Sequence, residues 1–328
     1  MYCLEEEKFS LLQNNAIQRY LSKRFRILLT GDADGVPPWL ATVAESDEPG
    51  LYLPDEAPWI AHADMATLVG GIRALLMQAL HPGSLTGVRQ HSRYKSDPLG
   101  RLSGTIRWLT VTTFASTASV SGEADRVNKM HQRVKGKYTD SKGKTVDYKA
   151  ADPHLLRWVH IAFMDSFLRC HQLYSTRPLP GGADAYISLW SKSVIPLGLT
   201  EVPMSEAELL EDLKNYRPEL VVNDETREVI RWIKHPPLPK TALPAYRFLF
   251  KAALAALPRE YQEMIGLGHP SLRIIRPITR NLLKFIRLAI GPESPIEEAA
   301  IERLHRAGQM KDGKVVRRRE PFLAGASA

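Results

Sequence analysis

An all-α fold is the class that this sequence predicts. Apolar residues recur at helical spacing along most of the chain, and no run shows the sustained apolar and polar alternation of a half-buried strand. The 328 residues include 44% hydrophobic and 24% charged side chains, an ordinary globular composition that can bury a sizeable core around an internal cavity. We expect one multi-helix domain over residues 1–307 and a basic, flexible tail over 308–328.

The helices are predicted from apolar periodicity and from Asp-Pro, Gly and Pro boundary signals. Between them, the Pro- and Gly-rich residues 35–63 predict an extended segment, and the polar residues 136–150 predict a surface loop. The expected helices cover about 5–28, 66–80, 99–119, 123–135, 152–174, 184–193, 205–215, 222–234, 241–256, 258–266, 271–290 and 295–307.

Two of these helices matter most for function. The helix over 152–174 is apolar nearly all round, which predicts a central element that is buried on several sides. In the helix over 123–135, His131 shares the apolar face with Ala124, Val127 and Val134. A neutral imidazole on such a face can bind a metal, although a hydrogen-bonded core histidine has the same pattern.

Several function classes lack support in the sequence. Cys3 and Cys170 are too few for a disulfide framework or a thiolate metal site. The motifs of serine hydrolases, P-loop nucleotide hydrolases and zincins are missing from the chain. We expect no transmembrane segment, because the apolar runs are short, and no signal peptide, because the first residues are acidic, so the predicted location is cytoplasmic.

The net charge is +8, and most of the excess lies near the C-terminus. Between Arg303 and Glu320, seven Lys and Arg residues stand against two acidic ones, a net +5. We expect a solvated tail there, with peripheral contact to a membrane or a partner as the alternative, and no nucleic-acid partner.

Three ordered blocks within residues 62–174 resemble the haem-b oxygenase family that contains MpaB and the latex-clearing rubber oxygenases. The blocks read HADMATLVGGIRALLMQALHPGSLTGVRQHSRYKSDPLGRLSGT, EADRVNKMHQRVKGKYTD and VDYKAADPHLLRWVHIAFMDSFLRCHQLY. The resemblance implies a globin-like helical core around one non-covalent haem b. It also implies that His131, in RVNKMHQRV, is the proximal iron ligand.

The same resemblance suggests roles for other residues. Arg101 and Thr105 match a distal arginine and threonine, so that one of them could bind a propionate or a polar substrate group while the other orients bound oxygen or water. Gly104 stands where rubber oxygenases carry a lysine that can cap the iron, which argues against polyisoprene as the substrate. His160 is a family feature, expected either to support the haem or to ligate it.

The catalytic base of the rubber oxygenases has no acidic counterpart in this sequence. Gln78, His81 and His91 are the polar groups in the matching block, and His81 or His91 could transfer protons or simply cap a helix.

The leading hypothesis is a haem-dependent oxygenase or peroxidase-like enzyme that acts on a hydrophobic small molecule with dioxygen or peroxide, served by a redox partner. Two alternatives stay open: a non-catalytic haem carrier or sensor, and a helical interaction or membrane-surface protein without a cofactor. The sequence leaves the substrate, the distal ligand and the oligomeric state open.

Overall fold

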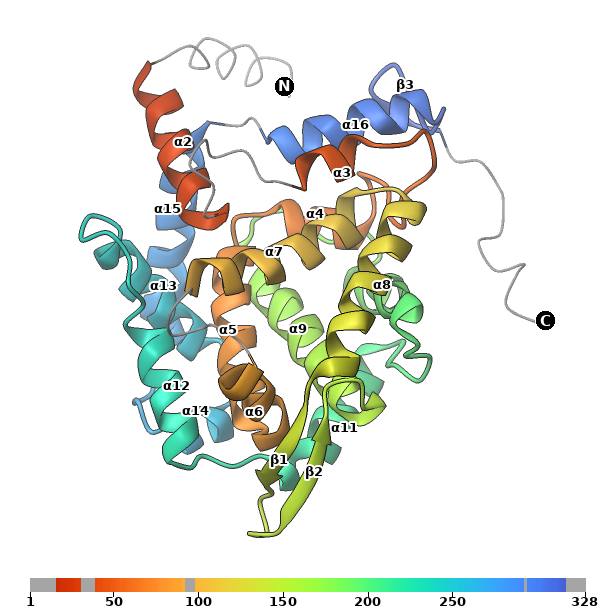
Figure 1. The fold of residues 1–328 in the computed structure, drawn as a ribbon. Helices are drawn as coiled ribbons and strands as arrows, with labels where there is room; N and C mark the ends of the chain where they lie inside the picture. Colours follow the sequence, from red (N-terminus) through yellow and green to blue (C-terminus); the bar gives the residue numbers. More distant parts are fainter. Residues whose placement is uncertain (1–15, 31–38, 92–97, 292–293, 317–328) are drawn as a thin grey trace, which may run out of the picture.

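The computed structural model describes residues 16–30, 39–91, 98–291 and 294–316, and it is mostly helical, as predicted. The helices surround a central pair, α5 and α9 (Figure 1). In chain order, the elements are α2 (Ala16–Thr30), α3 (Leu40–Ala44), α4 (Ala57–Ala63), α5 (Thr67–Leu80), α6 (Pro82–His91), α7 (Pro98–Phe114), α8 (Thr117–Arg133), β1 (Lys135–Thr139), β2 (Thr145–Lys149), α9 (Pro153–Tyr174), α10 (Gly182–Trp190), the 3-10 helix η1 (Ser191–Leu197), α11 (Glu206–Tyr216), the 3-10 helix η2 (Arg217–Glu219), α12 (Asp224–Lys234), α13 (Leu243–Ala255), α14 (Arg259–Ile265), α15 (Leu272–Ile290), α16 (Pro295–Arg306), β3 (Met310–Lys311) and β4 (Lys314–Val315).

The central helices α5 and α9 pack closely because Gly70 removes a side chain at their contact. A Cβ atom built on Gly70 would lie 2.6 Å from Cδ1 of Phe167, so even an alanine would require a shift. A buried ion pair adds to this contact: Nη2 of Arg73 lies 2.6 Å from Oδ2 of Asp165, with the two side chains 1% and 3% exposed. The Arg73 guanidinium also donates to Ser166 and to the carbonyl of Ala256, so it ties α9 and α13 to α5.

A buried carboxylate holds α7 and α8 together. Glu123 of α8 accepts hydrogen bonds from Arg107 of α7 at 2.8 Å and from Arg126, one turn along α8, at 2.5 Å and 3.0 Å. Burial alone would raise the pKa of Glu123, but the hydrogen bonds from Arg126 and Arg107 together lower it. These bonds connect α7 and α8 beyond the turn at Ser116. The Ser116 side chain caps the start of α8, because it accepts a hydrogen bond from the amide of Ser119.

The structure corrects two sequence predictions about local elements. Residues 136–150 were expected to be a loop, but most of them form an antiparallel hairpin of β1 and β2 that pairs Lys135 with Lys149. The alternation of half-buried Tyr138 and Val146 with exposed residues is too short to stand out among the lysines and glycines of this segment. Residues 35–63 were expected to be extended, but they contain α3 and α4.

The C-terminal stretch is also more ordered than expected. Arg303 was counted with the solvated basic residues, yet it is fully buried and donates to the carbonyls of Glu48 and Phe114. β3 and β4 then form a short hairpin within the predicted tail, while residues 317–328 lie outside the described residues.

Within the described part of the chain, no single helix has the length and hydropathy needed to cross a membrane. Only the bent pair of α4 and α5, with 94° between its helices, reaches that length and composition.

Candidate active site

His131 lies on the inward face of α8, in its last turn. The same face carries Val120, Ala124 and Val127, which are all buried, whereas the imidazole of His131 is half-buried. One turn earlier, the side-chain amide of Asn128 donates a hydrogen bond to the carbonyl of Pro196 at 3.4 Å, which connects α8 to η1. The predicted helical face is therefore present, and it points His131 towards the interior from the end of a helix.

A stripe of apolar residues on each of the two central helices is only half-buried. On α5 the stripe consists of Leu68, Gly71 and Leu75, at i, i+3 and i+7, and a Cβ atom added to Gly71 would meet nothing within 4 Å. On α9, Val159 and Phe163 are half-buried in the same way. Incompletely covered apolar surface at the middle of a protein is unfavourable unless another apolar group covers it.

The helices that pack on the central pair differ from those that pack on α7 and α8. The main neighbours of α5 are α4, α6, α9, α12 and α13, and those of α9 are α4, α5, α6, α10, α11 and α15. In contrast, α8 packs mainly on η1 and α7, and α7 packs mainly on α2, α3, α4, α8 and α16. In Figure 1, α7 and α8 diverge from their shared junction with α5 and α9 behind them. Among the described residues, α7 and α8 therefore make few direct contacts with α5 and α9.

The two central helices also carry two buried polar atoms without partners. Gln78 follows Leu75 by about one turn of α5, and His160 follows Val159 in α9; the Nε2 atom of each has no hydrogen-bond partner among the described residues. Burial, with a smaller contribution from the nearby Arg157 charge, lowers the pKa of His160 to about 3, so its imidazole is neutral. A buried polar atom without a partner costs about 1–3 kcal/mol, so both atoms could form a hydrogen bond with a further group.

The distal residues expected from the sequence belong to α7. Arg101 and Thr105 are both in α7, where Thr105 is half-buried and the neighbouring Gly104 is exposed. The backbone of Arg101 is helical, but its side chain lies outside the described residues, as does that of His91 in α6. One helix therefore carries both distal candidates, and its packing on α8 connects it to the helix of His131.

Comparison with known protein families identifies the family of this chain. Residues 59–288 match the family described as "ER-bound oxygenase mpaB/B'/Rubber oxygenase, catalytic domain". The chain belongs to this oxygenase family. The match extends well beyond the three sequence blocks, into α15, so the helices after residue 200 are part of the family domain. No match was found among curated proteins or among solved structures.

In this oxygenase-family chain, His81 has the contacts of a helix cap. It is 1% exposed and precedes α6, where its Nδ1 atom accepts from the amides of Gly83 at 3.1 Å and Ser84 at 3.4 Å. Because Nδ1 accepts, Nε2 carries the proton and donates it to Glu219 Oε2 at 3.1 Å. Both nitrogens are thus engaged, and a role in proton transfer stays a prediction.

Glu219 brings His81 together with a second histidine, His154. The Nε2 atom of His154 lies 2.9 Å and 3.0 Å from the two carboxylate oxygens, and its ring stacks on Tyr216. Hydrogen bonds from His154 and then His81 lower the pKa of Glu219 to about 2, and the bond to Glu219 raises the pKa of His154. Three such side chains could hold a metal ion by distance, but here His81 presents an N–H rather than a lone pair.

His62 shows what a fully satisfied core histidine looks like in this fold. Thr113 already donates its hydroxyl hydrogen to Leu109, so it accepts from Nδ1 of His62 at 2.8 Å, and Tyr186 donates to Nε2 at 3.0 Å. Burial, and then the nearby His171, lowers the pKa of His62 to about 3. His62 therefore contrasts with His160, which lacks a partner on Nε2.

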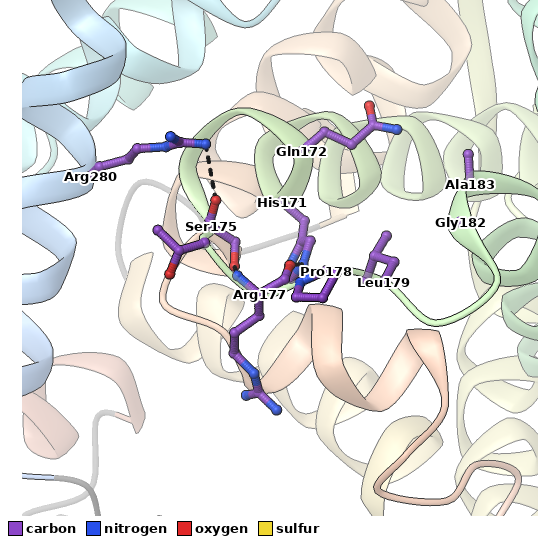
Figure 2. A pocket seen from close by; sticks show the side chains of 10 residues that line it. His171, Gln172, Ser175, Arg177, Pro178, Leu179, Gly182, Ala183 and Arg280 are labelled. Carbon is purple, nitrogen blue, oxygen red and sulfur yellow. Dashed lines mark hydrogen bonds between the residues drawn. The ribbon is translucent and has the colours of Figure 1, made fainter. Parts of the chain in front are cut away.

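An open pocket of about 490 Å³ lies at the C-terminal end of α9 (Figure 2). His171 lines it, but Nε2 of His171 lies 2.8 Å from the carbonyl oxygen of Arg177, so this atom is already used. Arg280 of α15 lines the pocket as well and donates to the carbonyls of Leu173 and Ser175. The lining mixes polar and basic side chains with Pro178, Leu179 and Ala183.

Sequence reasoning did not single out Glu123 or Glu219, although these residues fix the positions of two helix junctions. No local signal could have found them, because Glu123 is an acid within a polar helix start and Glu219 follows a proline in a short 3-10 helix. Glu123 matters because it also binds Arg107 on the preceding helix, and Glu219 matters because it binds two histidines that are distant in the sequence.

Proposed function

We propose that this chain is a haem-dependent oxygenase that acts on a hydrophobic small molecule, with His131 as the iron ligand. The family gives the oxygenase class. The observation that carries the haem assignment is the half-buried His131 on the inward face of α8, together with the apolar stripes of the central helices, which are only half-buried.

The residues present fit a haem b group. The flat, apolar macrocycle suits stripes such as Leu68, Gly71 and Leu75, where a side chain is missing and space is open. The polar edge of the group would meet buried atoms that lack partners, Nε2 of Gln78 and Nε2 of His160. In this proposal the helices enclose the group in a globin-like arrangement, and His160 supports it rather than ligating it.

The bound haem would supply the redox chemistry that activates dioxygen or peroxide, with electrons from a redox partner where the reaction needs them. The chain's own residues have other tasks. His131 offers a neutral imidazole, Arg101 holds a carboxylate of the group, and Thr105 orients a water or substrate hydroxyl beside it. The apolar stripes exclude water and select a hydrophobic substrate.

The test is the absorption spectrum of haem-supplemented protein, wild type beside His131→Ala. We expect a Soret band at one haem per chain in the wild type, and its loss or a large shift in His131→Ala. His305→Ala is the matched control, because His305 is an exposed histidine on α16, and it should leave the spectrum unchanged. Wild-type protein that takes up no haem would overturn the proposal.

Two further measurements separate the remaining readings. An unchanged spectrum in His131→Ala, together with a changed one in His160→Leu, would move the ligand to α9. Slow transfer of haem to a haem-free acceptor protein, with oxygen or peroxide consumed during oxidation of a lipophilic substrate, would support an enzyme. Rapid transfer without turnover would contradict it and indicate a carrier.

A further inference from the structure

The neighbouring helices α2 and α15 are both strongly basic, and both expose large apolar side chains. They pack against each other, and Nε2 of Gln18 donates to the carbonyl of Leu288 at 2.9 Å. Figure 1 shows them together at one end of the molecule, in red and blue. Neither helix contains an acidic residue, while α2 carries four and α15 five Lys or Arg residues. These nine positive charges exceed the net +8 of the whole chain, so the remainder is close to neutral.

The same two helices expose large apolar side chains. Of the thirteen such side chains that are exposed in the described residues, seven belong to α2 and α15, so exposed apolar area is concentrated here rather than scattered. We call these two helices, with their cations and exposed apolar residues, the α2/α15 surface. Its apolar members are Tyr20, Leu21, Leu272, Ile274, Ile278, Phe285 and Leu288.

On α15 the apolar residues form a stripe rather than a scatter. Ile274, Ile278 and Phe285 are 61%, 46% and 67% exposed, and their spacing of i, i+4 and i+11 places them on one side of the helix. Arg273 and Lys284 are exposed along one flank of this stripe. On the opposite side, Ile275, Thr279 and Leu283 are buried in the core. The helix therefore presents an apolar row to the outside, with cations beside it.

The way α15 is anchored leaves this stripe free to bind. Arg276 and Arg280, on the side near the core, donate to the carbonyl of Leu173 at 2.9 Å and 3.0 Å, where α9 ends. The helix is thus held by its inner cations, and the outer cations and the apolar stripe are not used in that attachment. On α2, Arg24 lies over the ring of Tyr20 at 6.0 Å, so a cation and an aromatic ring are again neighbours.

We propose that the α2/α15 surface docks on an anionic lipid membrane, with Phe285 and the isoleucine row in the headgroup and acyl boundary and the cations at the lipid phosphates. A helix with an apolar row flanked by Lys and Arg is the arrangement that binds in the membrane interface. The charge distribution argues against a second copy of this chain as the occupant, because two pairs of helices that are rich in Lys and Arg and contain no acidic residue would then face each other. A nucleic acid would leave the apolar row without a partner. The proposal is independent of the haem assignment.

The experiment is flotation of the full-length protein with vesicles of phosphatidylcholine alone or with about one third phosphatidylserine. We expect binding to the anionic vesicles only, and weaker binding at high salt. Ile274→Asp with Phe285→Asp should weaken binding at least tenfold, since it removes the apolar row and adds repulsion. Arg273→Glu with Lys284→Glu should weaken it by tenfold or more, because each cation near the surface contributes about 1 kcal/mol.

Controls keep the result interpretable. Leu210→Asp with Met204→Asp replaces two similarly exposed apolar residues at α11, away from the α2/α15 surface, and should leave vesicle binding unchanged. Circular dichroism and the thermal midpoint should match the wild type for every variant, because the replaced side chains are exposed. Deleting residues 308–328 should not abolish binding.

Four outcomes would overturn the proposal. They are absence of binding to anionic vesicles, equal binding by Ile274→Asp with Phe285→Asp, loss of binding only on deletion of residues 308–328, and a wild-type dimer that Phe285→Asp converts to a monomer. The last two would assign the membrane contact to the tail or the surface to a second copy.

Discussion

Two faces of the same helix pair, α5 and α9, differ in how completely they are packed. Where α5 meets α9 and α13, Phe167 fills the space left by Gly70, and Arg73 is bonded to groups on both neighbouring helices. On the face that carries Gly71 and Leu75, the apolar side chains are half-buried and the polar atom of Gln78 has no partner among the described residues. We infer from this difference that the first face stabilises the fold. The second face is the one that we propose binds the cofactor.

The largest effect should come from breaking the ion pair on the packed face. Asp165→Ala would leave the guanidinium of Arg73 buried without its carboxylate, which typically destabilises a protein by about 3–5 kcal/mol. Urea unfolding measures this loss. The double variant Arg73→Met, Asp165→Leu should recover most of it, because a well-packed apolar pair can replace a buried ion pair. A loss below about 1 kcal/mol in Asp165→Ala would contradict the view that this face holds the fold together.

The next effect compares neighbouring glycines on the two faces. Gly70→Ala places a methyl group 2.6 Å from Phe167 and should cost about 1–3 kcal/mol. Gly71→Ala meets open space and removes a flexible residue from a helix interior, so it should be neutral or stabilising by about 0.5–1 kcal/mol. Thermal unfolding of the two variants checks the pair. Equal costs would mean that the two faces are packed alike.

A larger side chain at Gly71 tests whether this face of α5 binds the cofactor. Gly71→Trp should fill the open space and reduce haem uptake in the spectroscopic titration while leaving the unfolding free energy within about 1 kcal/mol of wild type. Leu210→Trp, on the exposed side of α11, is a matched control that should leave uptake unchanged. Full uptake by Gly71→Trp would place the cofactor away from this face of α5.

Much of this fold could be predicted from the sequence because its helices are set by local signals. The helix predicted over 66–80 is found as α5, and the one predicted over 152–174 as α9, with Asp152 as the cap that accepts from the amide of His154. The hairpin of β1 and β2 was missed since its apolar alternation involves only two or three residues per strand. Periodicity finds a long element, but it cannot resolve a strand of five residues.

The candidate site was predictable only to the extent that it depends on one face of one helix. His131 could be placed by its spacing from Val127, because both residues belong to α8. The partners of His81 could not, since Glu219 lies in a distant 3-10 helix, and the missing partners of Gln78 and His160 become visible only when the helices are assembled. Satisfaction of a polar atom is a property of the packing and has no signature in the sequence.

The smallest effect concerns the cluster of His81, His154 and Glu219, which ties the end of α5 to the start of α9. The pKa of Glu219 is lowered from 4.5 to about 2, so its contribution is present above pH 4.5 and is lost as the pH falls towards 2. The pKa of His154 is raised from 6.5, so its contribution is complete below pH 6.5 and is lost as the pH rises through the raised value. The cluster should therefore stabilise the protein most between about pH 4.5 and 6.5.

The side chains of His154 and Glu219 are 52% and 40% exposed, so solvent screening keeps the effect below about 1 kcal/mol. Glu219→Gln should remove most of the extra stability that the wild type has at pH 5.5 relative to pH 8.5, as measured by urea unfolding at the two pH values. Glu302→Gln, an exposed glutamate on α16, should preserve that difference. If Glu219→Gln kept it as well, the link between α5 and α9 at this end would depend on Tyr216 and the His81 cap rather than on charge, and the packed face alone would hold the central pair.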